Sequence, residues 1–161
     1  MAYTRKRTAK RTRPKDRTCY ETAVYLLQFR DQSEKDLTRK LKEREYTEKE
    51  IEEAMERLRD YEYVNDEDLA DELFEAYRRR AQYGDAYIHQ KLKLKGLATE
   101  KHLQLEEEIE MAAALLQKKW GMSPKLRTDF KKSASFLLRR GFSHDTVMTV
   151  MHEMDFEETE E

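Results

Sequence analysis

The stretch GDAYIHQKLKLKGLATEKH (residues 84–102) has a counterpart on each side of it, and the three stretches together decide the fold. The counterparts are SEKDLTRKLKEREYTEKEI (residues 33–51) and DFKKSASFLLRRGFSHDTV (residues 129–147). In each stretch a leucine precedes a second apolar residue by five positions, in the pairs Leu41 and Tyr46, Leu92 and Leu97, and Leu137 and Phe142. The leucines are 51 and 45 residues apart, a period typical of stacked helical units that complete one another's small cores. The pattern predicts a repeat protein and favours binding over catalysis.

The composition supports narrow apolar faces. Of the 161 residues, 38% are hydrophobic and 41% are charged, so we expect an elongated molecule made of short helices. No run approaches the roughly 20 apolar residues of a membrane span, and no secretory signal is recognisable. Cys19 has no second cysteine to pair with, which fits a reducing compartment. We therefore expect a monomeric, cytoplasmic protein.

The fold class predicted is all-α, with three tandem three-helix repeats, about nine helices and no strand. The expected parts are a disordered basic arm (1–17), repeats at 18–64, 65–108 and 109–156, and an acidic tail (157–161). The arm holds eight basic residues and one acid without apolar periodicity, which is the reason for expecting disorder there.

Helix start signals and apolar stripes fill in this plan. Start signals lie at Ser33, Thr47, Asn65 and Ser143. The clearest stripes are Ile51, Ala54, Met55, Leu58 and Tyr61, and then Ile109, Ala112, Ala113, Leu116 and Trp120. We also expect a short helix after Thr99, and a helix opened by Ser123 and Pro124 that buries Phe130 and Leu138.

Charge is segregated along the chain. Residues 43–75 carry four basic and 15 acidic residues, whereas 76–101 carry seven basic and two acidic, and 118–140 carry eight basic and one acidic. Basic residues favour the second helix of each repeat, while third helices are acidic. If the repeats stack in similar orientations, one face is basic and binds phosphate with strong salt dependence.

The candidate contacts on the basic face are Arg39, Lys40, Arg78, Arg79, Arg80, Lys91, Lys93, Lys95, Lys131, Lys132, Arg139 and Arg140. Other interpretations stay open for some of them. Arg44, Lys95 and Arg140 share one repeat position, where a cation also complements a helix dipole. Tyr77 and Tyr83 flank three arginines as in single-strand binders, although Tyr77 fits a core stripe too.

No motif for catalysis or for a cofactor is present. The sequence lacks a P-loop, a nucleophile elbow, an HExxH motif and paired cysteines, so we expect neither an enzyme nor a cofactor. The histidines are His89, His102, His144 and His152. They lie on different predicted helices or eight residues apart, which indicates surface placement and no metal site.

The combination of these segments resembles the bacterial RecX family of RecA regulators, over roughly residues 19–156. The similar segments are AVYLLQFRDQSEKDLTRKL (23–41), YEYVNDEDLADELFEAYRRR (61–80), YGDAYIHQKLKLKGL (83–97) and LLRRGFSHDTV (137–147). The most specific piece is Val64 to Asp68 with Ala70, followed at the proper distance by Gly84, Ile88, Leu92 and Gly96.

The resemblance implies a curved, elongated array of three three-helix repeats that lies in the groove of the RecA filament on single-stranded DNA. Family membership also implies reduced ATP hydrolysis and strand exchange by RecA, and so restraint of recombination and of the SOS response. The basic residues named above then become candidate contacts with DNA or with the RecA filament.

Two alternatives remain at this stage. One is a helix-turn-helix DNA-binding protein, although residues 47–61 hold three basic and six acidic residues, which a DNA groove would repel. The other is a helical adaptor that binds only protein through its acidic face and shows no salt-dependent DNA binding.

Overall fold

The computed structural model describes residues 16–154, and all regular structure within this range is helical. It comprises eight α-helices and one short 3-10 helix, which confirms the all-α prediction. The chain divides into two compact units at Leu69 and Ala70. Most of the expected basic arm and all of the acidic tail lie outside the described residues. Between residues 16 and 154, no helix has both the length and the apolar character needed to cross a bilayer.

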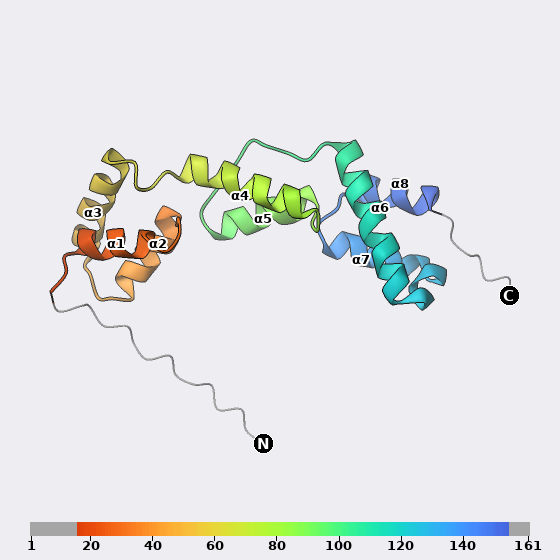
Figure 1. Cartoon of the computed structure of the whole chain (residues 1–161), viewed down its shortest axis with the longest axis horizontal. Coiled ribbons are helices and arrows are strands. Elements are labelled where there is room, and N and C mark those ends of the chain that lie inside the picture. Colours follow the sequence, from red (N-terminus) through yellow and green to blue (C-terminus); the bar gives the residue numbers. More distant parts are fainter. Residues whose placement is uncertain (1–15, 155–161) are drawn as a thin grey trace, which may run out of the picture. The chain divides into compact units, whose positions relative to one another are not determined.

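The first unit is a three-helix bundle, seen in orange to olive in Figure 1. Its helices are α1 (Cys19–Leu27), α2 (Glu34–Lys42) and α3 (Glu48–Asp60), and each packs against the other two. Thr18 and Thr47 begin α1 and α3 with capping boxes, and the Ser33 hydroxyl accepts the Asp36 amide at the start of α2. The core includes Leu37, Leu41, Ile51 and Leu58. Tyr61, expected in the buried stripe, is instead 63% exposed because α3 ends before it.

The second unit holds α4 (Asp66–Arg80) from Ala70 onward, then α5 (Asp85–Leu94), α6 (Leu105–Met122), η1 (Pro124–Thr128), α7 (Phe130–Arg139) and α8 (His144–Glu153). The long helix α6 packs against η1, α7 and α8. Ala112, Leu116 and Trp120 of α6 are buried there with Val147 and Val150 of α8. The Asn65 side chain accepts the Asp68 amide, and the Ser143 hydroxyl accepts the Thr146 amide. These hydrogen bonds confirm two predicted helix starts.

The three leucine anchors end their helices with one and the same turn. The amide five residues later donates to the leucine carbonyl, over 3.3 Å from Tyr46 to Leu41, 2.9 Å from Leu97 to Leu92 and 3.4 Å from Phe142 to Leu137. The residues before these donors are left-handed, with φ of 66° at Glu45, 72° at Gly96 and 83° at Gly141. All six anchor residues are buried. The sequence repeat is therefore a repeated Schellman motif, in which a hydrogen bond and an apolar contact close the helix end together.

Two predicted helices differ in the structure. The connection between α5 and α6 (residues 95–104) contains no helix, because its polar groups bond to α4 and α5. Ser123 and Pro124 open only the short η1, and Asp129 caps α7 by accepting the Lys132 amide. α7 thus starts later than expected, and Phe130 and Leu138, which were expected to be buried, are 44% and 46% exposed.

A close backbone approach joins the start of α5 to the turn between α7 and α8. The Gly84 amide donates to the Arg140 carbonyl over 2.8 Å. A Cβ atom at Gly84 would lie 2.3 Å from the Gly141 oxygen, and one at Gly141 would lie 2.4 Å from the Tyr87 Cβ. Only glycine fits at both positions, because a Cβ atom at either one would overlap atoms of the other segment. The two segments are therefore in direct contact through their backbones.

Glu108 of α6 is a buried carboxylate that bonds to two other helices. Its Oε1 accepts the Asp85 amide at 2.8 Å, and its Oε2 accepts the Thr146 hydroxyl at 2.7 Å. The side chain is thus placed beside the first turns of α5 and α8, where a helix dipole favours a negative charge. With 4% of its surface exposed, Glu108 is an internal cross-link of the second unit.

We predict that Gly84→Ala lowers the free energy of unfolding by about 1 to 3 kcal/mol, because the new methyl group overpacks a backbone contact. Gly121→Ala is the matched control, since a Cβ at Gly121 meets no atom within 4 Å and α6 gains helix propensity. Urea unfolding curves measure both changes. Equal stability of the two variants would contradict the close approach.

We predict that Glu108→Ala lowers the free energy of unfolding by about 1 to 3 kcal/mol for each of the two donors, the Asp85 amide and the Thr146 hydroxyl, that lose their bond to Glu108. Glu110→Ala removes an exposed carboxylate from the same helix and should change stability by less than about 0.5 kcal/mol. Calorimetric melting of both variants checks this difference. If Glu108→Ala melted like Glu110→Ala, the cross-link would contribute nothing.

Candidate functional site

Three tyrosines of the second unit come together where α4 turns into α5, and we term them the tyrosine cluster. Tyr77 lies on α4, Tyr83 in the turn and Tyr87 on α5, and all three are half-buried. The rings of Tyr83 and Tyr87 are stacked, with their centroids 3.9 Å apart and an angle of 8° between the ring planes. The Tyr77 ring is T-shaped to both, with its centroid 6.3 Å from that of Tyr83 and 6.4 Å from that of Tyr87. Tyr77 therefore packs within the cluster, and a nucleobase can stack only on an outer ring face.

A cation lies over each of the two stacked rings. The Arg140 Cζ is 5.6 Å from the Tyr83 centroid, and the Lys91 Nζ is 5.2 Å from the Tyr87 centroid. Arg140 also donates to the Gln82 carbonyl and lies 4.9 Å from the Phe136 ring. These contacts hold both cations beside the aromatic surface. The fold thus brings two of the predicted site residues together from α5 and from the end of α7.

The three arginines at the end of α4 are not equivalent. Arg78 pairs with Glu107 of α6 and, at 3.6 Å, with Glu75. The hydrogen bond that Arg78 donates to Glu107 is the main reason that the pKa of Arg78 is raised. Arg79 and Arg80 are exposed, and neither forms an ion pair with any residue in the range 16–154. Their charges are therefore more available to an anionic ligand than that of Arg78.

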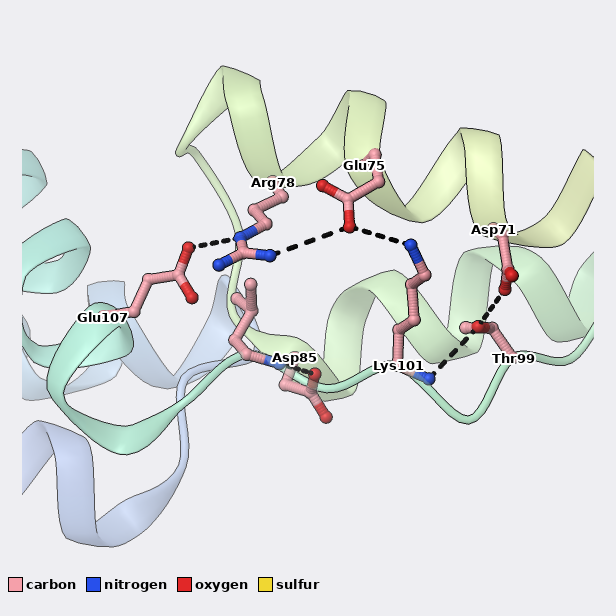
Figure 2. Close-up of polar contacts among 8 residues, drawn as sticks. Asp71, Glu75, Arg78, Asp85, Thr99, Lys101 and Glu107 are labelled. Atoms are coloured by element: carbon pink, nitrogen blue, oxygen red, sulfur yellow. Dashed lines mark hydrogen bonds and ion pairs between the residues drawn. The ribbon is translucent and has the colours of Figure 1, made fainter.

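Figure 2 shows how the α5–α6 connection is attached beside Arg78. The Thr99 hydroxyl donates to Asp71 at 2.6 Å, and the Lys101 Nζ lies 3.1 Å from a Glu75 oxygen. The same Glu75 oxygen pairs with Arg78, so one carboxylate joins the connection to the basic end of α4. The hydrogen bond from Lys101 is the main reason that the pKa of Glu75 is lowered.

The other predicted site residues have contacts of their own or are exposed. In the first unit Arg39 pairs with Glu43 at 2.7 Å, and Lys40 donates to the Gln32 side chain. Burial, followed by the charges of Arg30 and Arg39, lowers the pKa of Lys40. On α5, Lys93 is exposed and Lys95 is half-buried.

The residues on α7 complete the predicted set. Lys131 and Arg139 are exposed, and Arg139 donates to the Ser135 carbonyl at 3.3 Å. Lys132 pairs with Asp129 at 3.2 Å but remains 73% exposed. The backbone and side-chain hydrogen bonds from Lys132 lower the pKa of Asp129. Arg44, the first-repeat equivalent of Arg140, is buried and donates to the Lys40 carbonyl, which supports the helix-end interpretation for that residue.

Two members of this site were not singled out from the sequence. Tyr87 was missed as the stacking partner of Tyr83, although its four-residue spacing from Tyr83 was a usable signal. Glu107 was missed as the partner that occupies Arg78, and a separation of 29 residues gives no local signal for that contact. Together, the cluster and its cations offer aromatic faces and positive charge without a reactive group, which suits binding of an anionic polymer.

Comparisons with known proteins identify relatives of this chain. Residues 19–58 match the family model of the first three-helix domain of RecX, and residues 106–151 match that of the third. A Regulatory protein RecX from Actinobacillus pleuropneumoniae is 34% identical over 155 residues, covering 89% of this chain and 96% of the relative. That from Bacillus subtilis is 26% identical over 150 residues, covering 88% of this chain and 57% of its own length.

Solved structures show the same fold. The crystal structure of RecX from Lactobacillus salivarius matches with a TM-score of 0.73 at 24% identity, covering 84% of this chain and 93% of that chain. A second crystal structure of a regulatory protein RecX matches with a TM-score of 0.74 at 23% identity, covering 84% of this chain and 72% of that chain. These likenesses fit the predicted architecture of three-helix repeats.

We predict that Arg80→Gln weakens binding to oligothymidylate more than Arg78→Gln does. Each change removes one positive charge, but Arg78 is already paired with two carboxylates. Loss of one phosphate contact should lower the slope of log affinity against log salt by about 0.7. Fluorescence anisotropy at several salt concentrations measures both quantities. Equal losses in the two variants would show that the ion pairs do not matter.

Proposed function

The chain belongs to the RecX family, and on that premise we propose that it binds the RecA filament on single-stranded DNA and mostly inhibits it. The proposed effects are slower ATP hydrolysis and strand exchange by RecA, and thereby restraint of recombination and of the SOS response. The role is regulatory and requires no catalytic group of the chain itself. We propose that it acts as a monomer.

The observation that carries this proposal is the match of the family models at both ends of the helical region, with 34% identity to a regulatory relative over nearly its whole length. The tyrosine cluster with Lys91 and Arg140 supports it further. Such a surface suits non-specific contact with a DNA backbone, because its cations bind phosphate. We propose that the other predicted basic residues add further contacts with DNA or with RecA.

The decisive experiment is to titrate the protein into RecA that hydrolyses ATP on single-stranded DNA. We expect inhibition at fewer than one molecule per RecA subunit, because a bound regulator blocks its neighbours in a filament. Filament binding is followed in parallel by co-sedimentation. Absence of both inhibition and binding would refute the proposed function and favour the protein-only adaptor.

A charge variant tests the proposed basic contact within the same assay. Lys91→Gln, Lys93→Gln and Lys95→Gln together should weaken filament binding and flatten its salt dependence. The matched control replaces Lys35, Lys49 and Lys118 by glutamine, which removes the same charge from exposed positions on α2, α3 and α6. If both triple variants lost affinity equally, only net charge would matter and the proposed location of the contact would be wrong.

A further inference from the structure

Two histidines and an aspartate converge where the α5–α6 connection passes the first turn of α5. His102 Nδ1 lies 2.7 Å from Asp85 Oδ2, and His89 Nε2 lies 3.5 Å from the same oxygen. The two imidazole rings stack with centroids 4.5 Å apart. From the sequence, these histidines were expected at separate surface positions, but the connection contains no helix and brings His102 back beside α5.

These three side chains offer a chemically coherent set of metal ligands. One donor atom from each residue lies within 4.8 Å of the other two. Ligands of a tetrahedral zinc ion, at about 2.0 to 2.2 Å from the metal, are about 3.3 Å from one another, so small side-chain rotations suffice. The His102 side chain is 60% exposed and therefore has room to move. Two imidazoles with one carboxylate suit zinc and its neighbours better than calcium or magnesium.

The surroundings already orient these ligands. The second oxygen of Asp85 accepts the Leu103 amide at 2.7 Å, which fixes the carboxylate. To bind a metal ion, the His89 Nε2 gives up its contact with the Lys101 carbonyl oxygen, 3.0 Å away, while the Phe74 ring, 5.9 Å from the His89 ring, still lies beside the imidazole. Metal sites commonly depend on such supporting contacts, because these hold the ligands before the ion arrives. An open pocket of about 330 Å³ is lined by Asp85 and His102 but not by His89.

We propose that Asp85, His89 and His102 bind a divalent transition-metal ion of the zinc type. The ion replaces the hydrogen bond between His102 and Asp85 and fastens the α5–α6 connection to α5. The role of the ion is structural, because it stiffens this connection.

The test uses the full-length chain without a histidine tag, freed of metal by chelation, and zinc chloride as the probe. Isothermal calorimetry at pH 7.5 compares the parent with His89→Gln and His102→Gln. The matched controls are His144→Gln and His152→Gln, which alter the two remaining histidines, both exposed on α8. We expect each variant of the site to lose at least tenfold in zinc affinity and the controls to keep the parental value.

A second readout excludes a trivial effect of misfolding. Zinc should raise the melting temperature of the parent and of both controls, because a ligand that binds only the folded state stabilises it. The two site variants should melt as the parent does without zinc and gain nothing when zinc is added. Equal zinc affinity in all five proteins, or no measurable affinity in the parent, would overturn the proposal.

Discussion

The second unit depends on the backbone contact between Gly84 and the turn at Arg140 and Gly141. A hydrogen bond of 2.8 Å and the absence of both Cβ atoms fix the point at which α5 begins. This start places Asp85 beside the buried Glu108 and, within the next turns, Tyr87 beside Tyr83 and His89 beside His102. The tyrosine cluster and the proposed metal ligands are therefore consequences of one close approach between two turns.

Local chemistry explains what could be predicted from the sequence. The leucine anchors, the left-handed position at Gly96 or Gly141 and the start signals at Thr47 and Ser143 act within five or six residues, so their patterns are legible in the chain. The all-α class followed from them. Where a prediction needed the neighbouring element, it failed. The residues after Thr99 have polar content compatible with a helix, but Asp71 and Asp85 bind their hydroxyl and backbone groups instead.

The candidate site also shows the difference between what local sequence predicts and what tertiary contacts decide. The basic residues could be named from composition, yet their availability is decided by partners distant in sequence, as with Glu107 at Arg78. Arg140 was named for its charge, whereas its orientation over Tyr83 comes from the packing of α7 against the turn before α5. Charge alone therefore indicates which residues attract an anion, and tertiary structure decides which of them can meet it.

Glu108 has a consequence for how the second unit opens. Because one carboxylate holds the Asp85 amide and the Thr146 hydroxyl, fraying at either helix start leaves a buried negative charge with fewer donors. That penalty couples the two helix starts, which are about 60 positions apart in the chain. In hydrogen exchange, amides in the first turns of α5 and α8 should then share one opening reaction, so that a region built from repeats behaves as a single cooperative foldon.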